Sequence, residues 1–563
     1  MPIVQRLTDF LTRPRCLGLL LAVGLLLGTA HALIIMPLSV ITGTSDFWDY
    51  PRGTVPGGSL DMAQALIGNR YLQAAPWMLP FLHIPNLVPP EGTNAVWLDP
   101  VPLVGLIGRT LAGAGHSVNL LGWFLFLSLS VSGVAMTFVF WLAGAGSLIA
   151  AVAAACLADA MPALLFEWGH TSLVAHFPII LSLALYVASL KRPWSAALTG
   201  AWTLLLAGTM LIHIYTLVMV GAIWAASVTQ AWLDQARARN RILGQAMMTA
   251  ATLVAIGFAA GFLSSETSGI GTDQFGVFSL NLASPFIPQY SGVIPPLRHY
   301  LVGMHSQQFG YPGFGVEAVW AAAMAGLLAG AGDFKWRRHV ALILVLAGCF
   351  LFALSNRITL GSHQIIHIPL PQSLLFALGT FRASGRFIWP ILYATAAAAV
   401  VSILSWRNRR LAVGILAAAS LFQWIDADPL RHEAAQSTLH ADPEAIDRQS
   451  VLAFIAGTSA VSVFPSTACM EERTEDTAFM NRLLRIHVEI ELLASRNIQI
   501  LNNVYKSRGA ADCTRQAADR AGPLRPNESY IYLFGPAPSA EQLGGQDAMS
   551  VCRMISGFLA CKL

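Results

Sequence analysis

The sequence predicts an α-helical protein that crosses a membrane many times. The 563-residue chain is 55% hydrophobic and only 11% charged, whereas soluble domains carry about 25% charged residues. Apolar runs of about 18 to 20 residues recur between Cys16 and Trp424, and each is long enough to cross a hydrocarbon core of roughly 30 Å. The basic residues cluster in short loops without interleaved aromatic residues, so we expect no nucleic-acid partner.

The positive-inside rule predicts how these runs are oriented. Five basic clusters should all be cytoplasmic, which requires an even number of crossings between each cluster and the next. The clusters lie at 6–15, 191–192, 237–241, 335–338 and 407–410. About eleven transmembrane helices satisfy this parity, at 16–37, 118–142, 146–163, 173–190, 196–211, 214–232, 244–263, 316–331, 339–355, 387–405 and 411–427. The N-terminus is then cytoplasmic, and the chain beyond 428 lies outside.

The first run follows basic residues and contains "AHA" at 30–32, which resembles a signal-peptidase site. Because apolar sequence continues past this site and many further runs follow, we expect the run to be a retained membrane helix.

The cysteines give a separate indication of compartment. Three lie in apolar runs: Cys16, Cys156 and Cys349. The other four lie in the C-terminal region: Cys469, Cys513, Cys552 and Cys561. Four cysteines in one extracytoplasmic domain suit two disulfides, although three pairings are possible. No CxxC spacing supports a zinc site.

The predicted loops place most of the polar residues at one membrane face. External loops are expected at 39–117, 264–315 and 356–386, whereas the cytoplasmic loops are short. We therefore expect a transmembrane domain at 1–427 and a soluble periplasmic α/β domain at 428–563. In the latter, short β-type runs at 459–464, 498–501 and 530–534 alternate with helical stretches.

Asp61 lies in "GGSLDMAQALIGNRYL" (57–72), where a turn leads into a predicted helix. Aspartate favours helix caps, but a carboxylate at a membrane interface can also act as a general base. The first loop contains four further acids: Asp46, Asp49, Glu91 and Asp99. Converging carboxylates could hold a divalent cation, although the spacing shows no convergence.

Several basic residues lie at the predicted external face. Arg382 and Arg386 in "FRASGRFIWP" either snorkel to the interface or bind a phosphate, as arginine does well. Arg357 lies nearby, and His213 lies at a predicted break between two short spans. His170 and His176 are six residues apart, which is not one helix face, so a two-histidine metal site is not expected. Either histidine could instead bind a phosphate or pack.

An ordered set of motifs resembles a known family. "LDMAQALIG", "APW", "LDPVPL", "GHTSLVAHF", "HIYTLVMV", "QFGVFSLNLASPFIP", "QQFGYPGFG" and "FRASGRFIWP" follow one another in this chain. Together they resemble an uncharacterised bacterial family of multi-pass membrane proteins related to the GT-C glycosyltransferases. The resemblance covers residues 15–427 and continues into "NNVYKSRGAADC".

The resemblance implies a GT-C-like fold with a long first periplasmic loop, in the bacterial inner membrane. It also implies a polyprenyl-phosphate-linked sugar donor and a glycan, lipid or protein acceptor. Asp61 matches the acid that such enzymes use as a base or to orient the acceptor, and we expect it to be the base that accepts the acceptor's proton; Asp99 is the candidate for a second acid. Many of these enzymes have paired acids, whereas Met62 follows Asp61 here.

The remaining site predictions come from these motifs and from the loops around them. The donor phosphate is expected at Arg357, Arg382, Arg386 and His213. Substrate contacts are expected at Gln64, Trp77, His170, His176, Asp273, Gln274, Asn281 and Gln308. A transporter or flippase of lipid-linked saccharide, or a non-catalytic envelope assembly subunit, is the alternative. Transporters usually place polar groups near the bilayer midplane, whereas the polar groups here gather in large loops at one face.

Overall fold

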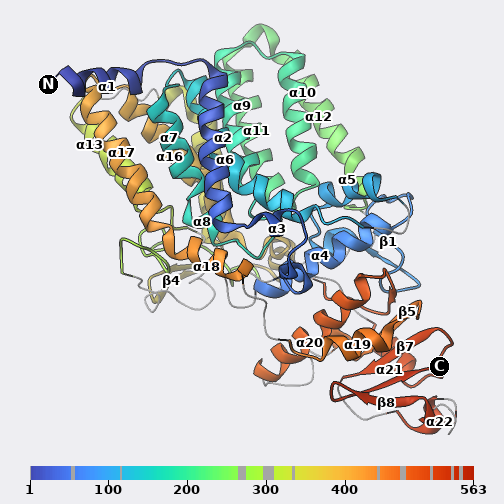
Figure 1. Cartoon of the computed structure of the whole chain (residues 1–563). Coiled ribbons are helices and arrows are strands. Elements are labelled where there is room, and N and C mark those ends of the chain that lie inside the picture. The colour runs from blue at the N-terminus through green and yellow to red at the C-terminus, as the bar shows by residue number, and fades with distance from the viewer. Residues whose placement is uncertain are drawn as a thin grey trace.

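The protein is a bundle of helices with a small β-sheet region attached at one end, as seen in the computed structural model (Figure 1). The structure describes residues 2–51, 58–113, 117–263, 274–295, 310–331, 336–439, 444–469, 477–506, 512–533, 538–543, 545 and 549–563. Helix α1 (Pro2–Thr12) lies across the end of the bundle opposite to the sheet.

Each of the eleven predicted transmembrane segments contains a helix. These are α2 (Leu17–Ile35), α6 (Leu121–Ala143), α7 (Leu148–Asp159), α9 (Phe177–Lys191), α10 (Ala196–Met210), α11 (Ile214–Asp234), α12 (Arg239–Ala260), α13 (Phe314–Leu328), α14 (Val340–Leu354), α16 (Trp389–Leu404) and α17 (Arg409–Asp426).

The length and composition of these helices show a multi-pass membrane protein. Within the described ranges, seven helices are long and apolar enough to cross a membrane. The number becomes eight if α17 and α18 (Asp428–Leu439), which meet at 43°, form one span. Helices α9, α10 and α13 have only 15 residues each. Eleven crossings therefore remain a prediction.

Small residues allow close contact between the helices in the bundle. A Cβ on Gly28 of α2 would lie 2.2 Å from the carbonyl oxygen of Ser130 in α6. A Cβ on Gly133 would lie 2.4 Å from Asp159 Oδ2. Both positions are therefore too close to their neighbours for any residue larger than glycine. Small residues are common where membrane helices pack closely.

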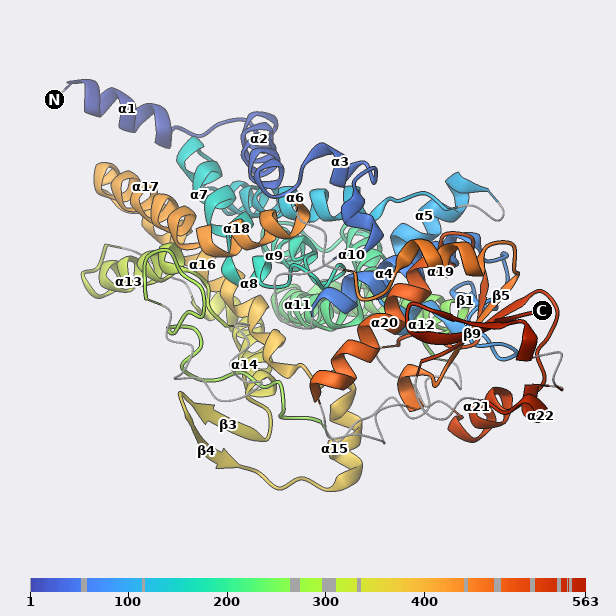
Figure 2. The same cartoon turned by 60° about the horizontal axis from the view of Figure 1, so that its bottom comes forward.

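The described parts of the predicted long loops lie at the same end of the bundle as the sheet (Figures 1 and 2). The first contains α3 (Leu38–Ile41), η1 (Asp46–Asp49), α4 (Gly58–Ala74), β1 (His83–Ile84), β2 (Thr93–Asn94), η2 (Ala95–Leu98) and α5 (Pro102–Ala112). The third contains β3 (Arg357–Leu360), β4 (His363–His367), α15 (Gln372–Leu378), η8 (Gly379–Phe381) and part of η9 (Ser384–Ile388). Short helix α8 (Pro162–Leu165) follows α7.

The C-terminal region contains a five-stranded sheet in the order β6-β5-β7-β9-β8. Its strands are β5 (Ala460–Phe464), β6 (Ile500–Leu501), β7 (Glu528–Tyr532), β8 (Cys552–Ile555) and β9 (Phe558–Lys562). Strands β6 and β7 run parallel to β5, whereas β9 is antiparallel to both β7 and β8. The helices are α19 (Arg448–Ile455), α20 (Thr477–Ser495), α21 (Cys513–Arg520) and α22 (Ala540–Leu543).

Disulfides join Cys469 to Cys513 and Cys552 to Cys561. Of the three pairings that the sequence permits, the structure contains this one. The second bridge links facing residues of the β8–β9 hairpin.

The C-terminal region is attached to α4 of the first loop. The hydroxyl of Tyr71 donates to the backbone oxygen of Gln499, and Arg70 Nη1 lies 3.0 Å from Ser495 Oγ. Strand β6 also pairs with the loop, because Leu501 N donates to Asn86 O at 3.0 Å and Val88 N donates to Leu501 O at 2.8 Å. The first loop therefore covers the outer edge of β6.

Candidate functional site

Four separate segments bring polar side chains together where the first loop meets the bundle. Helix α4 carries Asp61, and Asp99 directly follows η2. The turn after α8 carries Glu167 and His170, and η9 carries Arg386. Asp61 lies inside the first turn of α4 and does not precede it. A carboxylate in that turn interacts favourably with the positive end of the helix dipole.

Alternating acidic and basic groups form the center of this cluster. His170 Nε2 lies 3.0 Å from Asp61 Oδ2, and His170 Nδ1 lies 3.2 Å from Glu167 Oε2. Arg386 reaches the same carboxylate through both of its oxygens, with Nη2 at 3.2 Å from Oε2 and Nε at 3.4 Å from Oε1. The side chain of Asp61 is 31% exposed, whereas that of Glu167 is 1% exposed. The Asp61 end of the cluster can therefore meet a ligand.

Electrostatics keeps the inner groups of the cluster charged. Burial would lower the pKa of His170, but hydrogen bonds and charges from Asp61 and Glu167 outweigh it and raise the pKa to about 10. Burial would likewise raise the pKa of Glu167, but Arg386 and His170 lower it to about 2. At neutral pH, His170 is an imidazolium between two carboxylates.

Asp99 differs from Asp61 in its surroundings. It has a left-handed backbone, with φ of 47°, at the end of η2. Ser172 Oγ donates to Asp99 Oδ2 at 2.7 Å. Burial raises the pKa of Asp99 to about 7, although the Ser172 hydrogen bond and the charge of His170 oppose the rise. Asp99 is thus a carboxylate that exchanges a proton near neutral pH, as a general base should.

His176 occupies a packing position. Its ring is fully buried 4.1 Å from the ring of Trp389, and Nδ1 lies 2.8 Å from the Tyr393 hydroxyl. Of the two predicted histidines, only His170 lies in the cluster.

Two residues that were predicted to contact substrate, Gln64 and Asn281, form hydrogen bonds to backbone atoms that hold separate segments together. Gln64 Nε2 donates to Trp97 O at 2.9 Å, which ties α4 to η2. Asn281 Nδ2 donates to Gly361 O at 2.8 Å, and its Oδ1 accepts from Gly361 N at 2.9 Å. Both side chains are buried. The structure therefore gives both residues a role in positioning loops.

The other predicted residues lie outside the ion-pair cluster. His213 precedes α11, and its Nδ1 accepts from Tyr215 N at 3.2 Å. Trp77 is exposed and packs on Arg109, whose Cζ lies 4.7 Å from the ring. Arg357 is exposed in β3. Asp273 and Gln308 fall outside the described residues.

Arg382 has a different environment from Arg386. Its Nη1 lies 3.1 Å from Gln274 Oε1, and the contact is exposed. Arg386 is instead buried against Glu167. The two predicted phosphate ligands are therefore not equivalent, and Arg382 is the one open to an anionic ligand.

Sequence reasoning missed Glu167 and Ser172. Both lie in "EWGHTSLVAHF", in which only His170 and His176 were predicted to be site residues. An acid beside a polar turn in a membrane protein was the available signal, since ionisable residues there are rare and usually paired.

The described side chains do not fit a divalent cation. Among them, no group of three His, Cys, Asp or Glu residues could hold a metal ion. The carboxylates of Asp61 and Glu167 contact His170 and Arg386 instead.

The helices and this cluster define a multi-pass membrane protein with a charged site at one end of its bundle. The chain belongs to the family described as Domain of unknown function (DUF6311), which matches residues 25–428. No curated protein matches the chain.

One similar solved structure is the Archaeoglobus fulgidus oligosaccharyltransferase, tethered by a disulfide to an acceptor peptide containing the NVT sequon. The two chains share 12% sequence identity with a TM-score of 0.38, over 85% of this chain. This chain spans 63% of the length of that protein. At this level of likeness nothing about activity follows.

Proposed function

We propose that this protein is a membrane glycosyltransferase that moves a sugar from a polyprenyl-phosphate-linked donor to a cell-envelope acceptor. The acceptor is a glycan, a lipid or a protein. The single observation that carries the proposal is the pairing of two different carboxylates in one site. Asp61 is held by an imidazolium at 3.0 Å, and Asp99 has a pKa raised to about 7. The ordered motifs, which resemble those of a family related to the GT-C glycosyltransferases, support the same class.

The two carboxylates suit two different tasks. A proton acceptor works best when its pKa lies near the operating pH, which favours Asp99. Asp61 is bound to a charged histidine and is suited to orienting the acceptor hydroxyl. The sequence made Asp61 the first candidate for the base, and we now assign it the orienting role.

The reaction is a direct displacement at the anomeric carbon. The acceptor oxygen forms a bond to that carbon while its proton passes to the Asp99 carboxylate. The bond between the anomeric carbon and the phosphate oxygen breaks, and polyprenyl phosphate leaves. Arg382 stabilises the charge that develops on the departing phosphate, because its guanidinium is exposed beside Gln274. Arg386 acts indirectly, by holding Glu167 and through it His170.

We propose the bacterial inner membrane as the location, with the N-terminus in the cytoplasm. Residues 1–427 then form the transmembrane domain, and 428–563 form a periplasmic domain. The position of α1 at the end of the bundle opposite to the sheet supports this orientation (Figure 1). A lipid-linked donor would then present its headgroup at the site from the outer leaflet.

Sugar transfer by the full chain in lipid nanodiscs tests the proposal. A polyprenyl-phosphate donor carrying a radiolabelled sugar is mixed with envelope extract as acceptor. We expect label to leave the lipid, and Asp99→Asn to slow the loss by about 10²- to 10⁴-fold, the usual contribution of a general base. Lipid crossing the bilayer without loss of label would instead support a flippase.

A further inference from the structure

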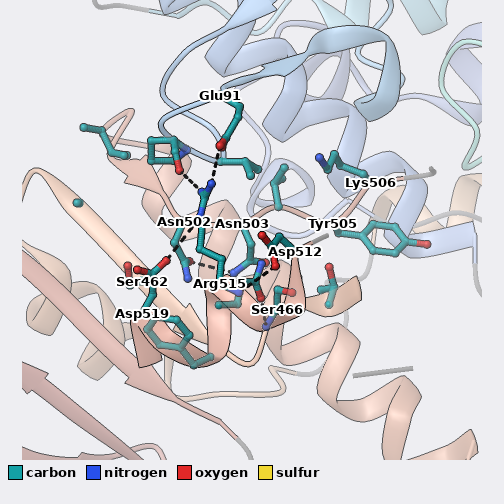
Figure 3. A pocket seen from close by; sticks show the side chains of 18 of the residues that line it. Glu91, Ser462, Ser466, Asn502, Asn503, Tyr505, Lys506, Asp512, Arg515 and Asp519 are labelled. Carbon is teal, nitrogen blue, oxygen red and sulfur yellow. Dashed lines mark hydrogen bonds and ion pairs between the residues drawn. The ribbon is translucent and has the colours of Figure 1, made fainter. Parts of the chain in front are cut away.

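A cavity of about 990 Å³ lies between the C-terminal sheet and the first loop (Figure 3). Its walls come from distant parts of the chain: Val88, Pro89, Glu91 and Gly92 in the first loop, Gln274 and Arg382 in the predicted second and third loops, and the C-terminal region. The volume lies at the upper end of the range for ligand-binding pockets. The candidate site described above does not include its C-terminal walls.

One wall of the cavity is a polar face of the sheet. Alternate residues of a strand point to the same face, so Ser462 and Phe464 of β5 both line the cavity beside Glu528 and Tyr530 of β7. Tyr530 Oη donates to Glu528 Oε2 at 2.9 Å, and Ser462 Oγ donates to Glu528 Oε1. Hydroxyls, a carboxylate and aromatic rings therefore meet at this wall.

The adjoining wall carries amide side chains in fixed positions. Asn502 Oδ1 accepts from Val463 N at 2.9 Å, and Asn503 Nδ2 donates to Val463 O at 3.1 Å. Asn503 Oδ1 and Ser466 Oγ are buried and, among the described residues, have no hydrogen-bond partner. Buried polar atoms usually bond to protein, water or ligand, so these two favour a polar occupant.

The charges around the cavity are balanced. Four acidic and four basic side chains line it. Arg515 of α21 reaches across to the first loop, where Nη1 lies 2.5 Å from Glu91 Oε1 and Nη2 donates to Pro89 O at 2.7 Å (Figure 3). A balanced set of charges does not select a strongly anionic ligand. It suits a neutral ligand with many hydroxyl groups.

The sheet edge next to the cavity is not open to a peptide. Peptides commonly bind by adding a strand to a free edge. The edge strand β6 already pairs with the first loop, through Leu501 N to Asn86 O and Val88 N to Leu501 O. A saccharide needs no free edge and is the better fit to these walls.

We propose that this cavity binds a neutral saccharide and holds the acceptor glycan during transfer. The second part rests on the proposed glycosyltransferase function and selects a glycan from its three acceptor classes. Arg382 links the two sites, because it lines the cavity and is also the proposed phosphate ligand. An acceptor held here would lie beside the leaving group of the donor.

Saccharide binding by the full chain in nanodiscs tests the cavity. The probes are fluorescent neutral tri- to hexasaccharides, a phosphorylated hexasaccharide and a hexapeptide. Ala518 and Ala517 are both exposed on α21, but only Ala518 lines the cavity. We expect Ala518→Phe to weaken binding of the neutral saccharides at least tenfold and Ala517→Phe to leave it unchanged. Ala460→Phe fills the cavity from β5 and should act like Ala518→Phe.

The proposal is overturned if the neutral saccharides do not bind, or if the peptide or the phosphorylated probe binds more tightly than they do. It is also overturned if the Ala517→Phe and Ala518→Phe proteins bind the neutral saccharides equally well. Donor turnover separates this proposal from the function on which it rests. The Ala518→Phe protein should still hydrolyse the donor, which releases its sugar to water, but should no longer transfer that sugar to a glycan. If wild-type protein binds saccharide at the cavity but never consumes donor, the glycosyltransferase proposal fails and the saccharide site stands.

Discussion

His170 holds Asp61 through a contact of 3.0 Å between Nε2 and Oδ2, and this contact joins the first loop to the helix bundle. The second nitrogen of His170 faces Glu167, which Arg386 holds in turn. Asp61 is therefore oriented by residues more than 100 positions away in the sequence. The position of its carboxylate should depend on the whole chain of contacts.

Removing the contact tests that dependence. Asp61→Asn and His170→Asn should each lower the rate of sugar transfer by about 10- to 100-fold, as expected for loss of a charged hydrogen bond. The double variant should be little worse than either single one, because both remove the same contact. The measurement is a double-mutant cycle on the transfer rate. His432→Asn, on the exposed face of α18, is the control. Additive losses would show that the two residues act independently.

The stability of the protein should fall as the pH rises from about 6.5 to 10. Folding raises the pKa of His170 from 6.5 to about 10, so the folded chain keeps a proton that the unfolded chain releases. This contribution is complete below pH 6.5 and is lost as the pH rises through about 10. Thermal unfolding in detergent at pH 6 to 10 measures it. His170→Asn should flatten the dependence, and an unchanged slope would contradict the assignment.

The rate of transfer should rise with pH through about 7. Asp99 accepts a proton only when ionised, and its pKa is raised to about 7. A pH–rate profile for wild-type protein and Asp99→Asn measures this. The variant should be slower and should lose the rise near pH 7. Asp46→Asn, in the same loop, should keep the rise. A wild-type rate that does not change between pH 5.5 and 8.5 would exclude Asp99 as the base.

The buried pair of Glu167 and Arg386 should matter for stability. Glu167→Gln leaves a buried guanidinium without its counter-charge, so we expect a loss of about 3–5 kcal/mol in the free energy of unfolding. The control is Asp49→Asn, which removes the exposed contact of 2.7 Å to Arg496. It should cost no more than about 1 kcal/mol. Equal effects of the two variants on unfolding would show that burial does not strengthen the Glu167 pair.

Much of the helical architecture could be predicted because its determinants are local. Apolar length and the position of basic residues predicted segments that all contain helices. A break near 213–215 was also predicted, and α10 ends at Met210 while α11 begins at Ile214. Only α10 is short, with 15 residues, because α11 extends over 21. The β8–β9 hairpin was missed, although Ser556 and Gly557 at its turn both have positive φ and a Ser-Gly pair is a turn signal.

The candidate site could be predicted only in part, because its contacts join distant segments. Asp61, Asp99, His170 and Arg386 were all candidates, but their partners were not predictable. Glu167 lies 219 residues from Arg386 in the chain. Arg386 was predicted to bind a phosphate, but it instead forms a buried ion pair with the Glu167 carboxylate. No local sequence pattern near Arg386 indicates this pairing. The same holds for the burial that sets the pKa of Asp99.

In the proposed function, the carboxylates of Asp61 and Asp99 together catalyse the transfer of a sugar from a lipid phosphate. The most direct test is the loss of radiolabel from a polyprenyl-phosphate sugar, in nanodiscs, by wild-type protein and by the Asp61→Asn, Asp99→Asn double variant. We expect turnover by the wild type and a rate lower by at least about 10²-fold in the double variant. Equal rates for the two proteins, or a wild-type protein that never releases label, would contradict it.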